Sequence, residues 1–384
     1  MATGLEFELM QSAQGSVSAA AIPPEVRAAY GLGSGGSSGE VVHLPSLINR
    51  TYLVRGDLGD GPRQLVLQRL HHVFAADVHL DIEAVTRHLE QRQIETPRLL
   101  RNRAGALWTV EEPALEESAA QGAAPGVWRA ITYIEGVTIH RSSDPIQLAS
   151  AAELLGRFHG ALFDLQHEFV HLRPLHDTAQ HLHKLRSALA SERGRSDAEA
   201  RELGEAILEQ ARELRLDFGE FPRRVLHGDP KLSNLLFQPG DPLRARCMID
   251  LDTLGRGFLA YELGDALRSW TNRAGEDQLE ADLDPEAVRA VLAGYARACP
   301  AELPSPEIGS AIDGLETVSL ELASRFAADA ILDSYFGWDA TRFPSRRVHN
   351  LVRARGQFSL ARQVRERGSE LREIAAQALA ARGI

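Results

Sequence analysis

Between residues 41 and 136, the chain alternates short apolar runs with turn-like polar segments. The strand-like runs are rich in β-branched and other apolar residues and cover 41–56, 63–70, 96–100, 106–112 and 126–136. One stretch, 77–94, instead repeats apolar residues at the spacing of an amphipathic helix. Its apolar positions are Val78, Ile82, Val85 and Leu89. The pattern predicts a small sheet with one helix packed on it.

After residue 143 the pattern becomes mostly helical. Helical spacing covers 144–162, 177–192, 196–216, 261–270, 285–298, 305–334 and 347–382. Two strand-like segments, 225–237 and 245–257, interrupt these helices. The predicted fold class is therefore α+β, with a small β-rich N-terminal lobe and a large, mostly helical C-terminal lobe.

Three regions are expected along the chain: an N-terminal segment over 1–40, a β-rich lobe over 41–136 and a mostly helical lobe over 137–384. The first region contains a possible short helix, with Pro24 in its first turn. The Gly/Ser-rich stretch 31–40 is expected to be flexible. A glycine-rich phosphate loop is the alternative, although the strand before it and the helix after it that such loops need are not predicted.

Composition narrows the class of protein. The 384 residues carry a net charge of −11, which argues against nonspecific binding to nucleic acid or to an anionic membrane. A phosphate ligand stays possible, because a bound divalent cation supplies local positive charge. The two cysteines, Cys247 and Cys299, form no disulfide framework and favour a cytoplasmic protein. No apolar run is long enough for a membrane span, and the N-terminus does not resemble a signal peptide.

The stretch VLHGDPKLSNLLF, residues 225–237, places a polar loop between two apolar arms. We expect a loop held between two strands, which is a suitable position for chemistry. Asp229 and Asn234 lie within it, and the next strand-like run ends in Asp250 and Asp252. Phosphoryl transfer from a nucleotide needs a carboxylate beside the acceptor hydroxyl and hard oxygen ligands for Mg²⁺. Asp229 suits the first role, and Asn234 and Asp250 suit the second.

HGDPKLSN followed by IDLD resembles the catalytic and metal-binding loops of the aminoglycoside phosphotransferase/choline kinase superfamily. Further stretches are INRTYLV, LVLQRLHHVF, DIEAVTRHLE, MIDLDTLGRGFLAYELGDALRSW and VHNLVRARGQF. They occur in the expected order from about 45 to 365, and they more closely resemble the N-acetylhexosamine 1-kinase branch. The resemblance implies a protein-kinase-like two-lobe fold that uses ATP and Mg²⁺. In such a fold the lobe over 41–136 would bind the nucleotide, and the lobe over 137–384 would carry the catalytic and substrate-binding residues.

The resemblance also implies roles for individual residues. Asp229 would be the catalytic base, and Asn234 and Asp250 the metal ligands. His227 would brace the loop, while Asp252 would support the metal site. Lys231 would contact the sugar or the transferred phosphate. In the sugar-kinase branch an arginine and an aromatic residue from late helices contact the sugar, and their nearest matches are Arg325 and Tyr335.

The resemblance also implies which residues bind the nucleotide. They are Asn49, Thr51, Gln68, Glu83, Tyr133 and Ile134. Many kinases carry a lysine on the third strand, paired with a helix glutamate. Gln68 stands at this position, with Arg69 beside it on the opposite face of the strand. Glu83 is the candidate helix partner, and the adenine is expected near Tyr133–Glu135.

Other polar residues have structural interpretations. We expect Glu262 and Asp265 to cap and orient the helix after the metal-binding strand. His71 and His72 read as solvated residues rather than metal ligands. Trp270 is expected in the core, where large aromatic residues are usually found.

The leading functional hypothesis is an ATP- and Mg²⁺-dependent sugar kinase that phosphorylates the anomeric hydroxyl of an N-acetylhexosamine such as GlcNAc or GalNAc. Alternatives are an aminoglycoside, another hexose or choline as acceptor. The low aromatic content, 6%, disfavours a cage for the quaternary ammonium of choline. A third hypothesis is a nucleotide-binding pseudokinase without catalysis. Expected partners are a nucleotide and a small sugar, and the sequence leaves open whether the protein is a monomer or a dimer.

Overall fold

The computed structural model describes residues 14–16, 21–32, 40–44, 49–56, 64–111, 126–170 and 175–380. It divides into two compact units. The first contains Met1–Val137, Asp164–Leu172 and Cys247–Leu254, and the second contains Thr138–Phe163, Arg173–Arg246 and Gly255–Ile384. The sequence predicted two contiguous lobes, whereas two later segments of the chain belong to the first unit. One of them carries Asp250 and Asp252.

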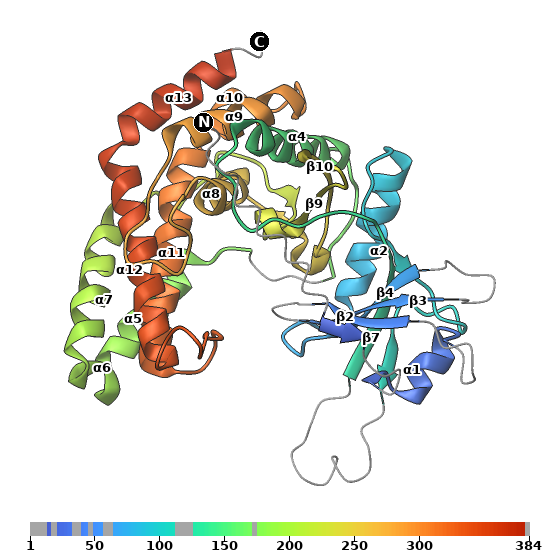
Figure 1. Cartoon of the computed structure of the whole chain (residues 1–384). Helices are drawn as coiled ribbons and strands as arrows, with labels where there is room; N and C mark the ends of the chain where they lie inside the picture. Colours follow the sequence, from blue (N-terminus) through green and yellow to red (C-terminus); the bar gives the residue numbers. More distant parts are fainter. Residues whose placement is uncertain are drawn as a thin grey trace, which may run out of the picture. The chain divides into compact units, whose positions relative to one another are not determined.

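The first unit contains an antiparallel sheet with the order β1-β2-β3-β4-β7-β5 and with β6 paired to β7. Figure 1 labels β2, β3, β4 and β7 of this sheet. Its strands are β1 (Gln14–Ser16), β2 (Glu40–Leu44), β3 (Arg50–Arg55), β4 (Gln64–Leu70), β5 (Leu99–Leu100), β6 (Thr109–Glu111) and β7 (Gly126–Thr132). Side chains alternate between the faces of a strand. Tyr52, Leu67 and Trp128 therefore point to one face, where they pack with Val26 of helix α1 (Pro24–Ala29).

Helix α2 (Val78–Gln91) is the amphipathic helix that the sequence predicted. Its four apolar positions are all buried, at 4% exposure or less: Val78, Ile82, Val85 and Leu89. Most of the Gly/Ser-rich stretch 31–40 lies outside the described residues, so both interpretations of it stay predictions.

The second unit is mostly helical, as expected. Its helices are α4 (Pro145–Leu162), α5 (Thr178–Ala190), α6 (Glu192–Ser196), α7 (Ala198–Gln210), α8 (Leu259–Trp270), α9 (Pro285–Ala298), α10 (Ser305–Gly309), α11 (Ala311–Leu332), α12 (Arg346–Glu366) and α13 (Gly368–Ala380). The predicted helix over 347–382 is divided at Arg367, where α12 ends and α13 begins.

Short strands and 3₁₀ turns connect these helices. They are η2 (Ala211–Glu213), β8 (Arg224–Leu226), η3 (Leu232–Asn234), β9 (Leu235–Gln238), β10 (Asp241–Met248), η4 (Leu251–Thr253) and β11 (Gly255–Gly257). β8 pairs with β11, and β9 pairs with β10. The two apolar arms of the stretch 225–237 predicted a strand at each end, and both strands, β8 and β9, are present.

Helix α11 is the centre of the second unit, where it packs against α5, α8 and α12. The buried cluster around it includes Leu185, Ile207, Phe326 and Leu351. The backbone of α11 reaches the backbone of α8 at Gly314, where an added Cβ atom would lie 1.8 Å from the carbonyl oxygen of Ala260. This close approach fixes α8 in the core of the unit.

These elements confirm the predicted α+β, protein-kinase-like class, with a β-sheet region first and a helical region after it. In the part of the chain that the structure describes, we find no helix with the length and apolar character needed to cross a membrane.

Candidate active site

The stretch 225–237 begins within β8 and ends within β9. The apolar arms are buried at 5% exposure or less: Val225, Leu226, Leu235 and Phe237. Gly228 has a φ of +84°, a backbone conformation that favours glycine. The polar insert is therefore a short loop tied to the core at both ends, as the sequence predicted.

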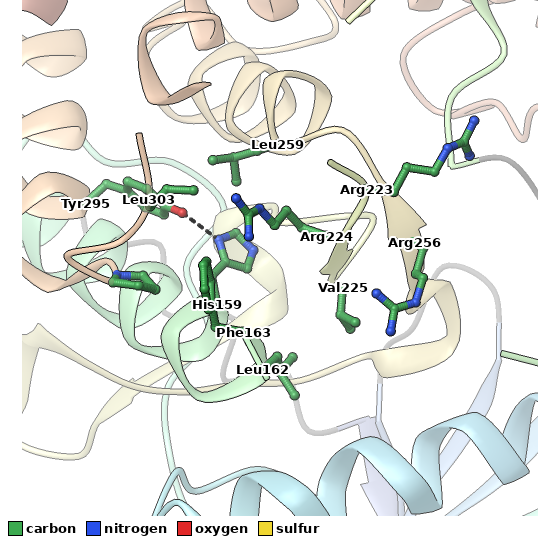
Figure 2. Close-up of a pocket in the computed structure, with 11 residues that line it drawn as sticks. His159, Leu162, Phe163, Arg223, Arg224, Val225, Arg256, Leu259, Tyr295 and Leu303 are labelled. Carbon is green, nitrogen blue, oxygen red and sulfur yellow. Dashed lines mark hydrogen bonds between the residues drawn. The ribbon is translucent and has the colours of Figure 1, made fainter. Parts of the chain in front are cut away.

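The side chain of Glu262, in the first turn of α8, anchors this loop. Its carboxylate accepts the backbone N–H groups of His227 and Gly228, both at 2.9 Å. His159 lies 3.2 Å from the same carboxylate. Its other ring nitrogen lies 2.9 Å from the hydroxyl of Tyr295 (Figure 2). Burial raises the pKa of Glu262, but the hydrogen bond and charge of His159 outweigh it, so the pKa lies below its usual value.

This arrangement corrects the expected role of Glu262 as a helix cap. The carboxylate bonds to the catalytic loop rather than to the N-terminus of its own helix. Asp265, one turn later, pairs with Arg268 at 2.7 Å. Trp270 is buried in the core as expected, and its indole N–H also donates to the carbonyl oxygen of Pro230 at 2.7 Å. Helix α8 therefore holds the loop at several points.

Asp229 presents its carboxylate at the surface of this anchored loop. Lys231 Nζ lies 3.0 Å from one carboxylate oxygen, and the side-chain amide of Asn234 donates to the other at 3.1 Å. The Asp229 side chain is still 28% exposed. Its orientation is therefore fixed while an acceptor hydroxyl can reach it. The imidazole of His227 is fully buried and lies 3.4 Å from the Asp229 backbone nitrogen, as expected of a bracing residue.

The donor chemistry of this region fits a divalent cation. The Nδ2 group of Asn234 donates to the carbonyl oxygen and the carboxylate of Asp229, which leaves Oδ1 as a hard oxygen ligand. Asp250, in the first unit, has φ 61° and ψ 62°, a left-handed conformation that is uncommon outside glycine. Within the described ranges, no group of three or more His, Cys, Asp and Glu side chains has a metal-binding arrangement. The amide oxygen of Asn234 and the carboxylate of Asp250 are both hard oxygen groups of the kind that Mg²⁺ prefers.

In the first unit, several predicted residues form one buried network. Asp252 forms an ion pair with Arg129, and Asn49 donates to the Asp252 carboxylate at 2.7 Å. Arg129 also donates to the amide oxygen of Gln68 at 2.9 Å, and Gln68 donates to Thr51 at 3.1 Å. Asp252 therefore supports the segment after Asp250 through bonds to the sheet.

The expected pair between Gln68 and Glu83 is not formed. Glu83 instead accepts hydrogen bonds from Arg87 at 2.8 Å and from Arg101 at 3.0 Å. His79 of α2 is buried and lies within the electrostatic influence of Arg129 and Asp252. Burial lowers the pKa of His79 to about 4, so this imidazole is neutral at physiological pH.

A second cluster of charged groups extends from Lys231 into the helices of the second unit. Asp265 interacts electrostatically with Lys231 and with His176. His176 Nδ1 lies 3.1 Å from Glu321 in the middle of α11, and Thr178 donates to the same carboxylate at 2.6 Å. We call the groups Lys231, Asp265, His176 and Glu321 the polar strip. Each carboxylate in the strip has a basic partner.

Arg325 and Tyr335, the predicted sugar contacts, lie near the end of this strip. Arg325 interacts electrostatically with His176, and its guanidinium lies 5.5 Å from the centre of the Phe336 ring. Tyr335 is 58% exposed in the loop after α11. The Asp329 carboxylate accepts the backbone N–H groups of Tyr335 and Phe336 at 2.8 and 2.9 Å. The loop that presents Tyr335 is therefore fixed at its base.

Three of these residues were missed by the sequence analysis. Arg129 is a lone charge inside an apolar strand, which is a usable signal for a buried ion pair. Glu321 is likewise a charge within a largely apolar helix. His176 carries no such signal, because its partner lies 145 residues further on.

Residues 41–301 match the model of the phosphotransferase enzyme family. The fold is similar to an aminopropanol kinase associated with a microcompartment, at a TM-score of 0.59 and 17% identity, covering 90% of this chain and 97% of that one. An amicoumacin kinase, solved with AMP-PNP and Ca²⁺, aligns at a TM-score of 0.57 and 15% identity over 85% and 91% of the two chains. A choline kinase from Cryptosporidium parvum aligns at 0.53 and 14% identity over 88% and 91%.

These identities are low, so the three structures show the fold alone. The family model, in contrast, covers more than half of the chain and includes the catalytic loop, Asp250 and the whole of α8. Kinases of this family use ATP with a divalent metal ion and act on small molecules, which agrees with the predicted cofactors. The chain therefore belongs to the phosphotransferase enzyme family.

Proposed function

We propose that this chain transfers the terminal phosphate of ATP to a hydroxyl group of a small sugar, with Asp229 as the catalytic base. The observation that carries the proposal is the Asp229 carboxylate, which is partly exposed and held between Lys231 and Asn234 on an anchored loop. A carboxylate in this setting orients the acceptor hydroxyl and takes its proton. Asn234 and Asp250 are the proposed ligands of Mg²⁺, which would neutralise charge on the phosphates.

The proposed acceptor is the anomeric hydroxyl of an N-acetylhexosamine. This hydroxyl is more acidic than an ordinary alcohol, so a single carboxylate base is adequate. The polar strip fits a neutral polyol better than a cation, because its two carboxylates are buried at 6% exposure or less, whereas the Lys231 side chain is 39% exposed and can donate. Its carboxylates Asp265 and Glu321 are paired with Arg268 and His176, so they do not present unpaired negative charge to a cationic aminoglycoside.

Further contacts are proposed on both sides of the reaction. Lys231 would contact the sugar or the transferred phosphate, and Arg325 and Tyr335 would contact the sugar. Tyr133 and Ile134, half-buried directly after β7, are the proposed neighbours of the adenine. Thr51, Gln68 and Glu83 stay proposals for the nucleotide side, although each of them already has a partner within the protein.

The experiment is ADP release with a panel of acceptors: GlcNAc, GalNAc, kanamycin, choline and aminopropanol. We expect turnover with an N-acetylhexosamine and a product whose phosphorus couples to the anomeric proton in ³¹P NMR. Turnover with kanamycin but not with the sugars would replace the proposed acceptor with an aminoglycoside. A folded protein that binds ATP and releases no ADP with any acceptor would support a non-catalytic module.

Asp229→Asn tests the base directly. The amide keeps the size of the side chain but cannot take a proton, so we expect kcat to fall at least about 100-fold. Asp241→Asn is the matched control, because Asp241 opens β10 in the same unit and has no proposed role. An unchanged kcat in Asp229→Asn would contradict the assignment.

A further inference from the structure

Arg129 stands at the centre of a polar row that crosses three strands of the first unit. Gln68 on β4 is the direct cross-strand neighbour of Arg129 on β7 and of Thr51 on β3. The row faces away from the apolar cluster around Leu67, because neighbouring residues of a strand point to opposite faces. Arg129 Nε donates to Gln68, and Gln68 in turn donates to Thr51. The guanidinium is therefore held in one orientation by the sheet itself.

The other two guanidinium nitrogens of Arg129 both bond to Asp252, which follows Asp250 by two residues. One of these bonds measures 2.8 Å, and together they form a bidentate pair. The side chains of Arg129 and Asp252 are only 4% and 1% exposed. A bidentate arginine–carboxylate pair adds geometric specificity to its attraction. The Asp252 carboxylate is therefore fixed relative to β7.

A second residue of the first unit, Asn49, bonds to the same Asp252 carboxylate. Asn49, immediately before β3, donates to Asp252 at 2.7 Å and accepts the backbone N–H of His71 at 2.9 Å. On the other side of Asp250, Thr96 donates to the carbonyl oxygen of Met248 at 3.3 Å. The segment from Met248 to Asp252 is thus bonded to the N-terminal sheet region before and after Asp250.

Asp250 itself needs such support. Its left-handed backbone, at φ 61° and ψ 62°, is one of only three positive-φ conformations at non-glycine residues in the described chain. Such conformations persist where the surrounding structure over-determines them, and they occur often at functional sites. A carboxylate that approaches a cation from this backbone depends on the residues that fix the neighbouring segment.

We propose that Arg129 is a positioning residue that sets the place of Asp250 through Asp252, so that the ion pair, rather than a strand lysine, couples the sheet to the metal–nucleotide complex. This inference rests on the proposed role of Asp250 as a Mg²⁺ ligand. Gln68, at the position of the usual lysine, directs Arg129 instead of carrying a charge. Arg129 acts through Asp252, because its buried guanidinium leaves no room for a phosphate contact.

The test is the affinity for ATP, measured by titration calorimetry with Mg²⁺ and again with EDTA. Arg129→Met is expected to weaken the Mg²⁺-dependent gain in affinity about 10-fold or more, as for other residues that orient metal ligands. The affinity in EDTA should change less than about twofold, because the guanidinium does not contact the nucleotide. Arg129→Lys should restore part of the gain, since the amine keeps the charge but not the bidentate geometry.

Arg69→Met is the matched control. Arg69 is the neighbour of Gln68 on β4 and pairs with Glu111 at 3.0 Å, but it is 36% exposed and has no link to Asp252. It should leave both affinities unchanged. Asp252→Asn, which keeps the shape of the side chain, provides the same test if Arg129→Met does not fold.

Two results would overturn the inference: a folded Arg129→Met or Asp252→Asn protein with the full Mg²⁺-dependent gain, or an equal loss of affinity with Mg²⁺ and with EDTA. The second result would show that Arg129 supports the nucleotide site as a whole. If the unmodified protein gains no ATP affinity from Mg²⁺, the proposed function fails instead, independently of Arg129.

Discussion

The carboxylate of Glu262 lies 2.9 Å from the backbone nitrogen of His227, a residue 35 positions earlier in the chain. A second bond from the backbone of Gly228 makes Glu262 a clamp on the loop that presents Asp229. Buried carboxylates that accept several N–H groups fix backbone geometry, because an unmade hydrogen bond is costly in the interior. The position of the catalytic carboxylate therefore depends on a helix that does not contact the substrate in the proposed mechanism.

Glu262→Gln tests this clamp. The amide NH₂ would face at least one of the N–H groups that Glu262 now accepts, so we expect the free energy of unfolding to fall by about 2 kcal/mol. We also expect kcat to fall roughly 10- to 100-fold, because a displaced base is no longer aligned with the acceptor. Urea denaturation and steady-state kinetics measure the two effects.

Asp197→Asn is the control for a general loss of stability. Asp197 accepts the backbone N–H of Ala200 at 3.0 Å and pairs with Arg347, in the same unit but without a contact to the loop. Its substitution should lower stability and leave kcat unchanged. Equal losses of kcat in both variants would show that the effect of Glu262 is not specific to the loop.

Local patterns predicted most of the fold and the loop that carries Asp229 and Asn234. Helix α2 followed from four apolar residues at helical spacing, and the loop with Asp229 and Asn234 followed from a polar insert between apolar arms. Both signals are local, so they can be detected in a single sequence. The family model that matches the chain agrees with the predicted class of kinase.

The partners of buried charges could not be predicted in this way. Glu262 was expected to cap its own helix, but it bonds to a loop that is distant in the sequence. Glu83 was expected beside Gln68, but its carboxylate forms ion pairs with Arg87 and Arg101. Tertiary packing decides which charged residues pair. Arg129 is another buried charge whose partner the sequence does not reveal. The charge inside β7 is visible in the sequence, but Asp252 is not visible as its partner.

The close contact between α8 and α11 gives a prediction for Gly314→Ala. The new Cβ atom would lie 1.8 Å from the carbonyl oxygen of Ala260, so the two helices must separate. We expect a loss of at least about 1–3 kcal/mol in the free energy of unfolding, which is typical of overpacking. Because α8 carries Glu262, kcat should fall as well.

Gly160→Ala is the control, since its Cβ would meet only the Pro300 side chain at 3.6 Å. That variant should be as stable as the parent or about 0.5–1 kcal/mol more stable.

The His176–Glu321 pair predicts how stability changes at mildly alkaline pH. Burial lowers the pKa of His176, but the charge of Glu321 outweighs it and holds the pKa above its usual 6.5. The folded protein therefore binds this proton more tightly than the unfolded chain. The resulting stabilisation is complete below about pH 6.5 and is lost as the pH rises through the higher pKa of the folded state.

Unfolding by urea at pH 6, 7, 8 and 9 checks this prediction. Stability of the parent protein should decrease over this range more steeply than that of His176→Gln, which has no imidazole to titrate. His181, Asp265 and Arg325 also act on His176 or on Glu321, and they are present in both proteins. Parallel pH profiles for the two proteins would contradict the assigned pair.

Asp329 controls the loop that presents Tyr335. Its carboxylate accepts backbone N–H groups from Ser334 and Phe336 as well as Tyr335, and the amide of Asn350 at 2.9 Å. Burial raises the pKa of Asp329, but these donors outweigh it and hold the pKa below its usual 3.8. The stabilisation is therefore present above about pH 3.8 and is lost as the pH falls through the lower pKa of the folded state.

Asp329→Asn should release this loop without disturbing the catalytic base. The amide group would turn an NH₂ toward backbone donors, so Tyr335 would lose its fixed position. If Tyr335 contacts the sugar, KM for the sugar should rise roughly 10-fold, which corresponds to a lost contact of about 1.4 kcal/mol, while the affinity for ATP stays the same. Tyr335→Ala should raise KM to a similar extent, and the double variant should add little, because both substitutions remove the same contact. Fully additive effects on KM would mean that Asp329 acts elsewhere, and an unchanged KM in Tyr335→Ala would remove Tyr335 from the proposed sugar site.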